Sequence, residues 1–136
     1  MYKIEKKDFG FKLTFGETIA VEEMEQWVKD SETALKSCTS DFGVFIDMRT
    51  LKPVTNDART IMEKGQKLYK QGGMTRSVVI VDSAIMAMQF KRLAKESGIY
   101  TWERYIDASS NSDWEKIGEN WITKSLDPDE KVPAGT

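Results

Sequence analysis

The chain has 136 residues, of which 40% are hydrophobic and 31% charged, and its formal net charge is −2. These values are ordinary for one soluble globular domain, and no basic footprint for nucleic acid or an anionic membrane is present. The sequence contains no histidine and a single cysteine, Cys38. Catalysis by Ser-His-Asp or Cys-His groups within one chain, and an intrachain disulfide, are therefore excluded.

Three further expectations follow from the composition. We predict a non-catalytic protein that holds no metal and no other cofactor, because the commonest catalytic base and zinc ligand is absent from the sequence. No apolar run is long enough to insert across a membrane. The single free cysteine is typical of a protein in the reducing cytoplasm.

The N-terminal segment predicts a β-hairpin followed by a helix. Strands are expected at residues 2–6 and 11–15, with Gly10 in the turn at a positive φ angle. In the second strand apolar and polar side chains alternate, so one face is buried and the other meets solvent. Apolar residues at three- and four-residue steps then predict a helix over residues 21–37.

Two short apolar runs are the most informative part of the chain. They predict strands at residues 43–49 and 76–82, apolar on both faces, as in strands that are covered on both sides of a sheet. Asp47 and Asp82 then lie at the carboxyl ends of these strands. Open α/β sheets usually place their ligands at this edge.

Helix-period segments and one more strand complete the pattern. A helix over 56–71 follows a cap at Thr55 or Asn56, and Gly72-Gly73 ends it. The other expected elements are a helix capped by Ser83 that ends before Gly98, a strand at 100–106, and a last helix for which Ser112 begins a capping box.

The element order is therefore ββαβαβαβα. It predicts an α/β fold with a mostly parallel sheet, an antiparallel N-terminal hairpin and covering helices. Residues 1–126 form a single domain in this interpretation. Residues 127–136 are polar and contain two prolines, which predicts a flexible C-terminal tail.

Residues 44–58 read VFIDMRTLKPVTNDA, an apolar strand ending in aspartate, a short loop and a helix start. This segment resembles STAS-type domains, the sulfate-transporter and anti-sigma-factor-antagonist domains and their relatives, and the likeness in element order covers residues 2–125. In the antagonists the helix begins with an Asp-Ser pair whose serine is phosphorylated by a partner kinase. Aligned without gaps, the pair falls on Thr55 and Asn56.

Asn56 has no hydroxyl group, and Thr55 would serve only with a different loop register. The resemblance therefore implies a STAS-like module without the phosphorylatable serine. Related stand-alone domains that lack the switch are thought to bind small apolar or lipid-like ligands or to dimerise. The resemblance thus favours a non-catalytic module.

Asp47 and Arg49 are two residues apart at a strand end, so their side chains point the same way. Arg49 could hold an anionic ligand that Asp47 orients. The favoured interpretation is a local hydrogen-bond clamp on the loop that follows.

Two helix starts are candidate binding sites. Thr55 and Asn56 at one could offer backbone N–H groups to an anion, and Asp82 and Ser83 at the other repeat the arrangement of a strand end followed by a cap. Capping is favoured for both. If the two strands are neighbours, Asp82 lies near Asp47, and paired carboxylates can perform acid/base hydrolysis.

The third helix carries the least ordinary pattern. Its expected core stripe comprises Met86, Phe90, Leu93 and Ala94. Ile85 and Met88 fall well outside that stripe. Two exposed apolar residues, one of them an adaptable methionine, are candidates for a partner or ligand surface.

We therefore predict a small regulatory or interaction module of STAS-like fold that binds a protein partner or itself as a homodimer. The alternative is a binder of a small apolar or lipid-like ligand in a pocket between helices and sheet. A hydrolase that uses Asp47 and Asp82 is a third hypothesis. No nucleic-acid partner is expected.

Overall fold

A computed structural model describes residues 1–38 and 41–130 of the chain. The order of its elements is the predicted one, with a short 3-10 helix added before the last strand. The strands are β1 (Tyr2–Lys7), β2 (Gly10–Phe15), β3 (Phe42–Asp47), β4 (Met74–Val81) and β5 (Glu103–Asp107). The helices are α1 (Val21–Leu35), α2 (Asn56–Gln71), α3 (Ala84–Ser97), η1 (Ile99–Thr101) and α4 (Trp114–Lys124).

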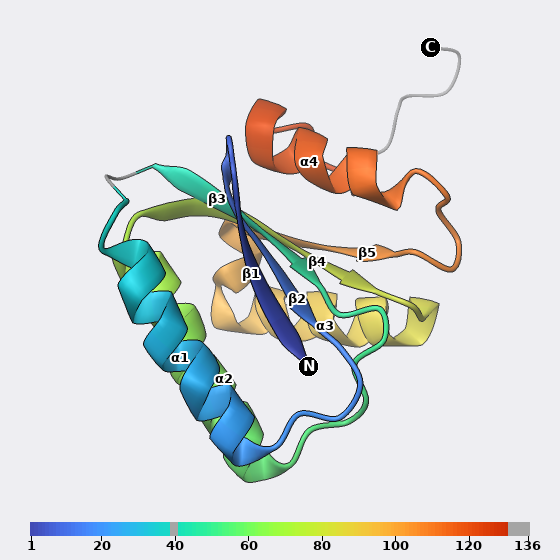
Figure 1. Cartoon of the computed structure of the whole chain (residues 1–136). Helices are drawn as coiled ribbons and strands as arrows, with labels where there is room; N and C mark the ends of the chain where they lie inside the picture. Colours follow the sequence, from blue (N-terminus) through green and yellow to red (C-terminus); the bar gives the residue numbers. More distant parts are fainter. Residues whose placement is uncertain (39–40, 131–136) are drawn as a thin grey trace, which may run out of the picture.

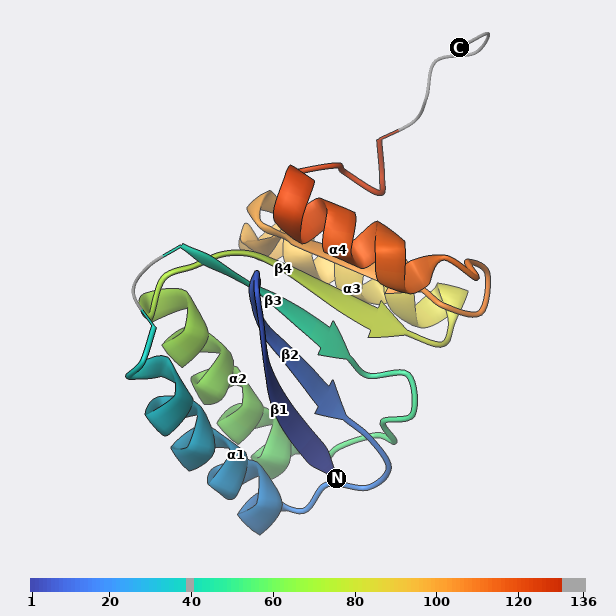
Figure 2. The same cartoon turned by 45° about the horizontal axis from the view of Figure 1, so that its top comes forward.

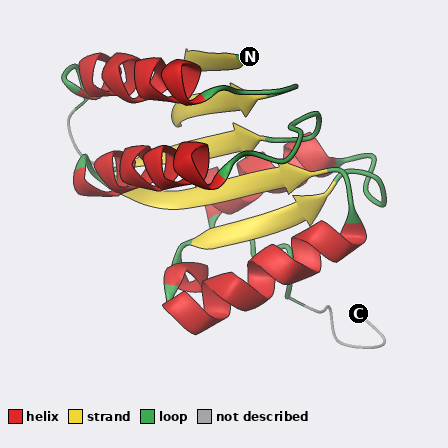
Figure 3. Ribbon diagram, turned by 90° about the horizontal axis from the view of Figure 1, so that it is seen from below, coloured by secondary structure: helices red, strands yellow, loops and turns green. Residues whose placement is uncertain are grey.

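The strands form one five-stranded sheet in the order β1-β2-β3-β4-β5 (Figures 1 and 3). β1 and β2 are antiparallel, and each later strand is parallel to the one before it. Phe45 of β3 lies opposite Val78 of β4, so the two apolar strands are neighbours, as predicted. Gly10 closes the first hairpin at φ +145°, a conformation that glycine adopts readily.

Helices cover the two faces of the sheet unequally. α1, α2 and α3 pack on one face, and α4 packs alone on the other (Figure 2). α4 contacts β3, β4 and β5. On the α4 side of the sheet, β1 and β2 carry polar side chains, as expected for strands with one solvent-exposed face. These side chains are Lys3, Glu5, Lys12 and Thr14.

The larger part of the core lies beneath α1 and α2. Trp27 of α1 is 1% exposed and packs edge-to-face on Phe15, with ring centroids 4.9 Å apart. It also stacks on Tyr69 of α2, at a centroid distance of 6.0 Å. The two helices approach so closely that a Cβ at Gly65 would lie 2.1 Å from the indole ring. A glycine is therefore required where α2 crosses Trp27.

Several predicted boundaries differ from the structure; among them, α1 ends at Leu35 and β4 begins at Met74. β3 ends at Asp47 because the side chain of Asp47 accepts the backbone N–H of Arg49 at 3.0 Å and turns the chain. The last strand begins at Glu103, since the residues before it form η1. The predicted capping box at Ser112 is wrong: the N-cap of α4 is Asp113, and its side chain makes no capping hydrogen bond.

Part of the segment that we predicted to be a flexible tail can be described. Residues 131–136 lie outside the described residues, whereas Asp127 and Asp129 form ion pairs with the body of the domain. Among the described residues, no helix is both long and apolar enough to span a bilayer.

Candidate functional site

The carboxyl ends of β3 and β4 bring the first candidate residues together. Asp47 is the last residue of β3, and Asp82 follows the last residue of β4, the neighbouring strand. Asp47 is 6% exposed, and Arg49 binds it through two parallel hydrogen bonds of 3.0 Å each. Asp47 therefore already has a partner for each of its oxygens.

Arg49 is held on a second side by an aromatic ring. Its guanidinium carbon lies 4.1 Å from the centroid of the Trp114 ring of α4, a typical cation–π geometry. The hydrogen bonds to Asp47 raise the pKa of Arg49, and the negative charges of Glu115 and Asp82 raise it further. This arrangement fits the interpretation that we favoured, a clamp on the loop after β3, better than an anion site.

The two predicted capping residues are caps. Thr55 Oγ1 accepts the backbone N–H of Ala58 at 3.2 Å, and Ser83 Oγ accepts that of Met86 at 3.3 Å. Asn56 is the exposed first residue of α2. Figures 1 and 2 show the start of α2 beside the start of α1, away from the start of α3. The two helix starts therefore do not form one site.

The outward side of α3 exposes four large apolar side chains, together with polar residues such as Gln89 and Glu96. Ile85 and Met88 are each 69% exposed, in the orientation that the sequence predicted. The prediction that Met86 and Leu93 face the core is wrong, because they are 38% and 54% exposed. Ala94 is buried, as predicted, and Ala87 is buried as well; these small side chains let the helix lie close to β5.

A half-buried polar group that the sequence analysis missed lies on β4 and β5. Glu103 accepts a hydrogen bond of 2.7 Å from Ser77 Oγ and another from the hydroxyl of Tyr105. Burial raises the pKa of Glu103, although both hydrogen bonds act in the opposite direction. No described Lys or Arg forms an ion pair with this carboxylate. Only the strand register, which places Ser77 opposite Glu103, could have revealed the group.

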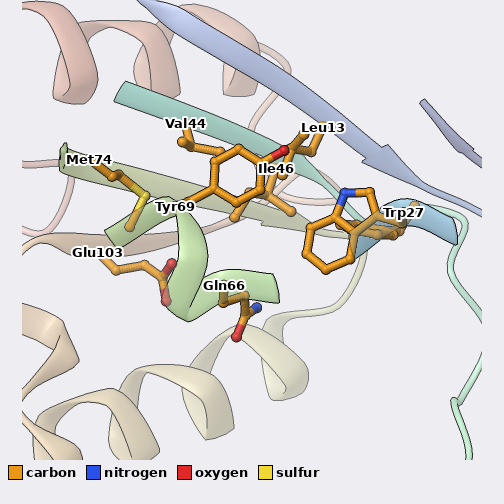
Figure 4. A pocket seen from close by; sticks show the side chains of 9 residues that line it. Leu13, Trp27, Val44, Ile46, Gln66, Tyr69, Met74 and Glu103 are labelled. Atoms are coloured by element: carbon orange, nitrogen blue, oxygen red, sulfur yellow. The ribbon is translucent and has the colours of Figure 1, made fainter. Parts of the chain in front are cut away.

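Glu103 also borders a small cavity beneath α2 (Figure 4). The cavity has a volume of about 20 Å³ and is lined on its other sides by Trp27, Gln66 and Tyr69, among others. The Nε1 group of Trp27 is buried and has no hydrogen-bond partner among the residues that the structure describes. A space of this size holds roughly one water molecule, whereas ligand pockets commonly measure about 300–1,000 Å³. The alternative prediction of a ligand pocket gains no support from this cavity.

We expect Glu103→Gln to stabilise the protein at neutral pH. Because the native pKa of Glu103 is raised, the native state loses stability as pH rises from the unfolded value, about 4.3, through the native value. A glutamine carries no charge; its carbonyl can accept the hydrogen bond from Ser77, and its amide can donate to the hydroxyl oxygen of Tyr105. Urea denaturation at pH 7 should show a gain of about 1–2 kcal/mol in the free energy of unfolding, and a smaller gain at pH 4.

The matched control is Glu96→Gln, an exposed position on α3. This change should alter the free energy of unfolding by less than about 0.5 kcal/mol at either pH. Equal gains at pH 4 and pH 7 for the Glu103 variant would show that the carboxylate is not desolvated in the native state.

A second missed group is Arg104, which is 7% exposed on the α4 face of β5. It makes a bidentate ion pair with Asp127, at 2.8 and 3.1 Å. Its guanidinium carbon lies 3.8 Å from the Tyr100 ring centroid and 4.3 Å from that of Trp121. The hydrogen bonds from Arg104 lower the pKa of Asp127. This group ties the C-terminal segment to the edge of β5.

Comparison with known proteins identifies the type of fold. No protein-family model and no curated protein matches the chain. A solved structure does match, with a TM-score of 0.58 and 21% identity over 84% of this chain and 91% of the other. That protein is an uncharacterized member of the DUF3478 family from Shewanella loihica PV-4 with a SpoIIAA-like fold. The present chain has a SpoIIAA-like fold.

The SpoIIAA-like fold confirms the STAS-like architecture that the segment 44–58 predicted. At the start of α2, where the resemblance places a phosphorylated serine, this SpoIIAA-like domain has Asn56. Within residues 1–38 and 41–130 no group of three His, Cys, Asp or Glu side chains is arranged to hold a metal ion.

Proposed function

We propose that this SpoIIAA-like domain is a non-catalytic interaction module that binds a protein partner through the outward face of α3. The observation that carries the proposal is the exposure of four large apolar side chains on this one helix, which we call the α3 face: Ile85, Met86, Met88 and Leu93. Single exposed apolar residues are common on proteins, but a contiguous group usually marks an interaction surface.

The composition of the α3 face supports a helical or extended protein segment as the partner. Met86 and Met88 are unbranched and adapt to the shape of an apposed surface. Arg92 is exposed beside them and forms no ion pair with a described residue. A partner segment with apolar anchors and an acidic flank would complement this surface. The single cysteine, Cys38, supports a cytoplasmic location for the module.

We expect the double variant Ile85→Glu/Met88→Glu to lose partner binding. Charges at the centre of an apolar contact must be desolvated without a partner, which commonly costs several kcal/mol and lowers affinity at least about 100-fold. The measurement is affinity capture from extracts of the source cells, with the wild-type and variant chains immobilised at equal density and the bound proteins quantified by mass spectrometry.

Leu126→Glu is the matched control, because Leu126 is also 54% exposed but lies outside α3. Proteins retained by the wild type and by the Leu126 variant, but lost from the double variant, would be partners of the α3 face. Their affinity is then measured by titration calorimetry with the purified partner. Identical capture by all three chains would refute the proposal.

A further inference from the structure

The two edges of the sheet differ in how they are covered. At the β5 edge, Arg104 donates hydrogen bonds to the carbonyl groups of Tyr100 and Glu103, and its ion pair with Asp127 brings the C-terminal segment to this edge. β1 is the other edge (Figure 3). Among the described residues, no strand pairs with its outer side and no turn or side chain bonds to its outward backbone groups. An uncovered edge strand is a template for a further strand.

The pairing of β1 with β2 identifies which backbone groups point outward. Met1 and Gly16 exchange two hydrogen bonds, of 2.7 and 2.9 Å. Hydrogen-bonded and non-hydrogen-bonded pairs alternate along antiparallel strands, so Lys3 and Glu5 also bond to β2. The N–H and C=O groups of Tyr2, Ile4 and Lys6 therefore face away from the sheet, ready to bond to another strand. The positions of these outward groups fix which registers are possible.

The charges on β1 complement a second, antiparallel copy of the same strand. If the two-fold axis passes through Ile4, Tyr2 faces Lys6 of the second copy, and all outward groups of both strands are paired. In this register Lys3 faces Glu5 of the second copy, and Glu5 faces Lys3. These are non-hydrogen-bonded positions, where opposing side chains are closest.

Neighbouring registers are unfavourable. A shift by two residues in one direction places Lys3 opposite Lys3, and the opposite shift places Glu5 opposite Glu5. Shifts by one residue would align outward groups with groups that already bond to β2. The register centred on Ile4 thus brings opposite charges together at Lys3 and Glu5 and satisfies the backbone at the same time.

The surroundings of β1 leave room for the second strand. On one face, a shallow open groove separates β1 from α1, and its far wall is formed by Asp30 and the small side chains of Thr33 and Ala34. Ile4 lines this groove and would meet Ile4 of the second copy there. On the other face α4 lies over β3, β4 and β5, so no helix obstructs the Lys3–Glu5 contacts (Figure 2).

We propose that two copies of this chain associate through antiparallel pairing of β1, centred on Ile4, into one continuous sheet. The interface uses the outward backbone groups of Tyr2, Ile4 and Lys6 and the reciprocal Lys3–Glu5 ion pairs. This interface is separate from the α3 face. The experiments can therefore show dimerisation without partner binding, or partner binding without dimerisation.

A charge exchange across the two-fold axis tests the interface. Lys3→Glu or Glu5→Lys alone replaces both attractive contacts of the dimer by repulsive ones and should raise the dimer dissociation constant at least about tenfold. The double variant Lys3→Glu/Glu5→Lys restores opposite charges and should restore the dimer. The measurement is sedimentation equilibrium over a range of concentrations, in which the wild type should approach twice the chain mass of 15.5 kDa.

Lys116→Glu on α4 is the matched control, since it makes the same charge change at an exposed position far from β1 and should leave the dimer intact. Glu5 faces Lys12 of β2 within the chain, so thermal denaturation must show that each variant is folded. In the wild type, the amides of Ile4 and Lys6 should exchange more slowly with solvent as concentration rises. A chain that stays at 15.5 kDa, or a folded double variant that stays monomeric, would overturn the proposal.

Discussion

Replacing Trp27 by alanine should lower the free energy of unfolding by about 3–5 kcal/mol, as is usual when a buried tryptophan is truncated. The indole is 1% exposed and joins β2, through Phe15, to α2, through Tyr69. Gly65, which lies against the indole ring, has no side chain that could fill the space left by its removal. Urea denaturation followed by circular dichroism should show a midpoint more than about 1 M lower.

Trp27→Phe is the matched variant. It keeps an aromatic ring and removes the Nε1 group that has no partner, so we expect it to cost less than half as much as the alanine variant. A loss below about 1 kcal/mol for Trp27→Ala would show that α1 and α2 do not pack around the indole as described.

Replacing Arg104 by methionine should lower the free energy of unfolding by about 3 kcal/mol at pH 7, because it leaves Asp127 without its cation. Methionine retains apolar contact with Trp121 but cannot make the bidentate hydrogen bonds. The effect should depend on pH. The native pKa of Asp127 is lowered, so its stabilising contribution is complete above the unfolded value, about 3.9, and is lost as pH falls through the native value.

The double variant Arg104→Met/Asp127→Asn is the control for this pair. It removes the unpaired charge, so its unfolding free energy should recover part of the loss. Chemical denaturation between pH 7 and pH 2 measures both variants. If wild type and Arg104→Met differ by the same amount throughout this range, the ion pair does not contribute to folding.

The sequence correctly predicted those helices and strands whose local residue pattern has a single physical explanation. β3 and β4 are apolar on both faces because helices cover both sides of them, and this pattern identified them as central strands. α2 was predicted with its observed bounds because Thr55 caps it and Gly72 follows it. The core face of α3 was predicted correctly for Phe90 and Ala94. It was predicted wrongly for Met86 and Leu93, since hydrophobicity alone ranks them above Ala87. The helix α3 lies close to the sheet, and the small side chains on its buried face permit this close approach.

The candidate sites were predicted less completely, for a related reason. Asp47 and Arg49 are neighbours in the chain, so their contact could be anticipated. Trp114, which completes that clamp, and the pairing of Ser77 with Glu103 come from elements far apart in the sequence. Pairs of this kind depend on the register of strands and on which face a helix covers. Neither is encoded in a local pattern.

The arrangement of α1, α2 and α3 on one face of the sheet has a consequence for any assembly built on β1. A two-fold axis normal to an extended sheet leaves both α3 helices exposed on the same side. A target that carries two copies of the recognised segment could then engage both helices at once. Its second contact would form at a high effective concentration, so weak individual contacts would give tight, bivalent binding.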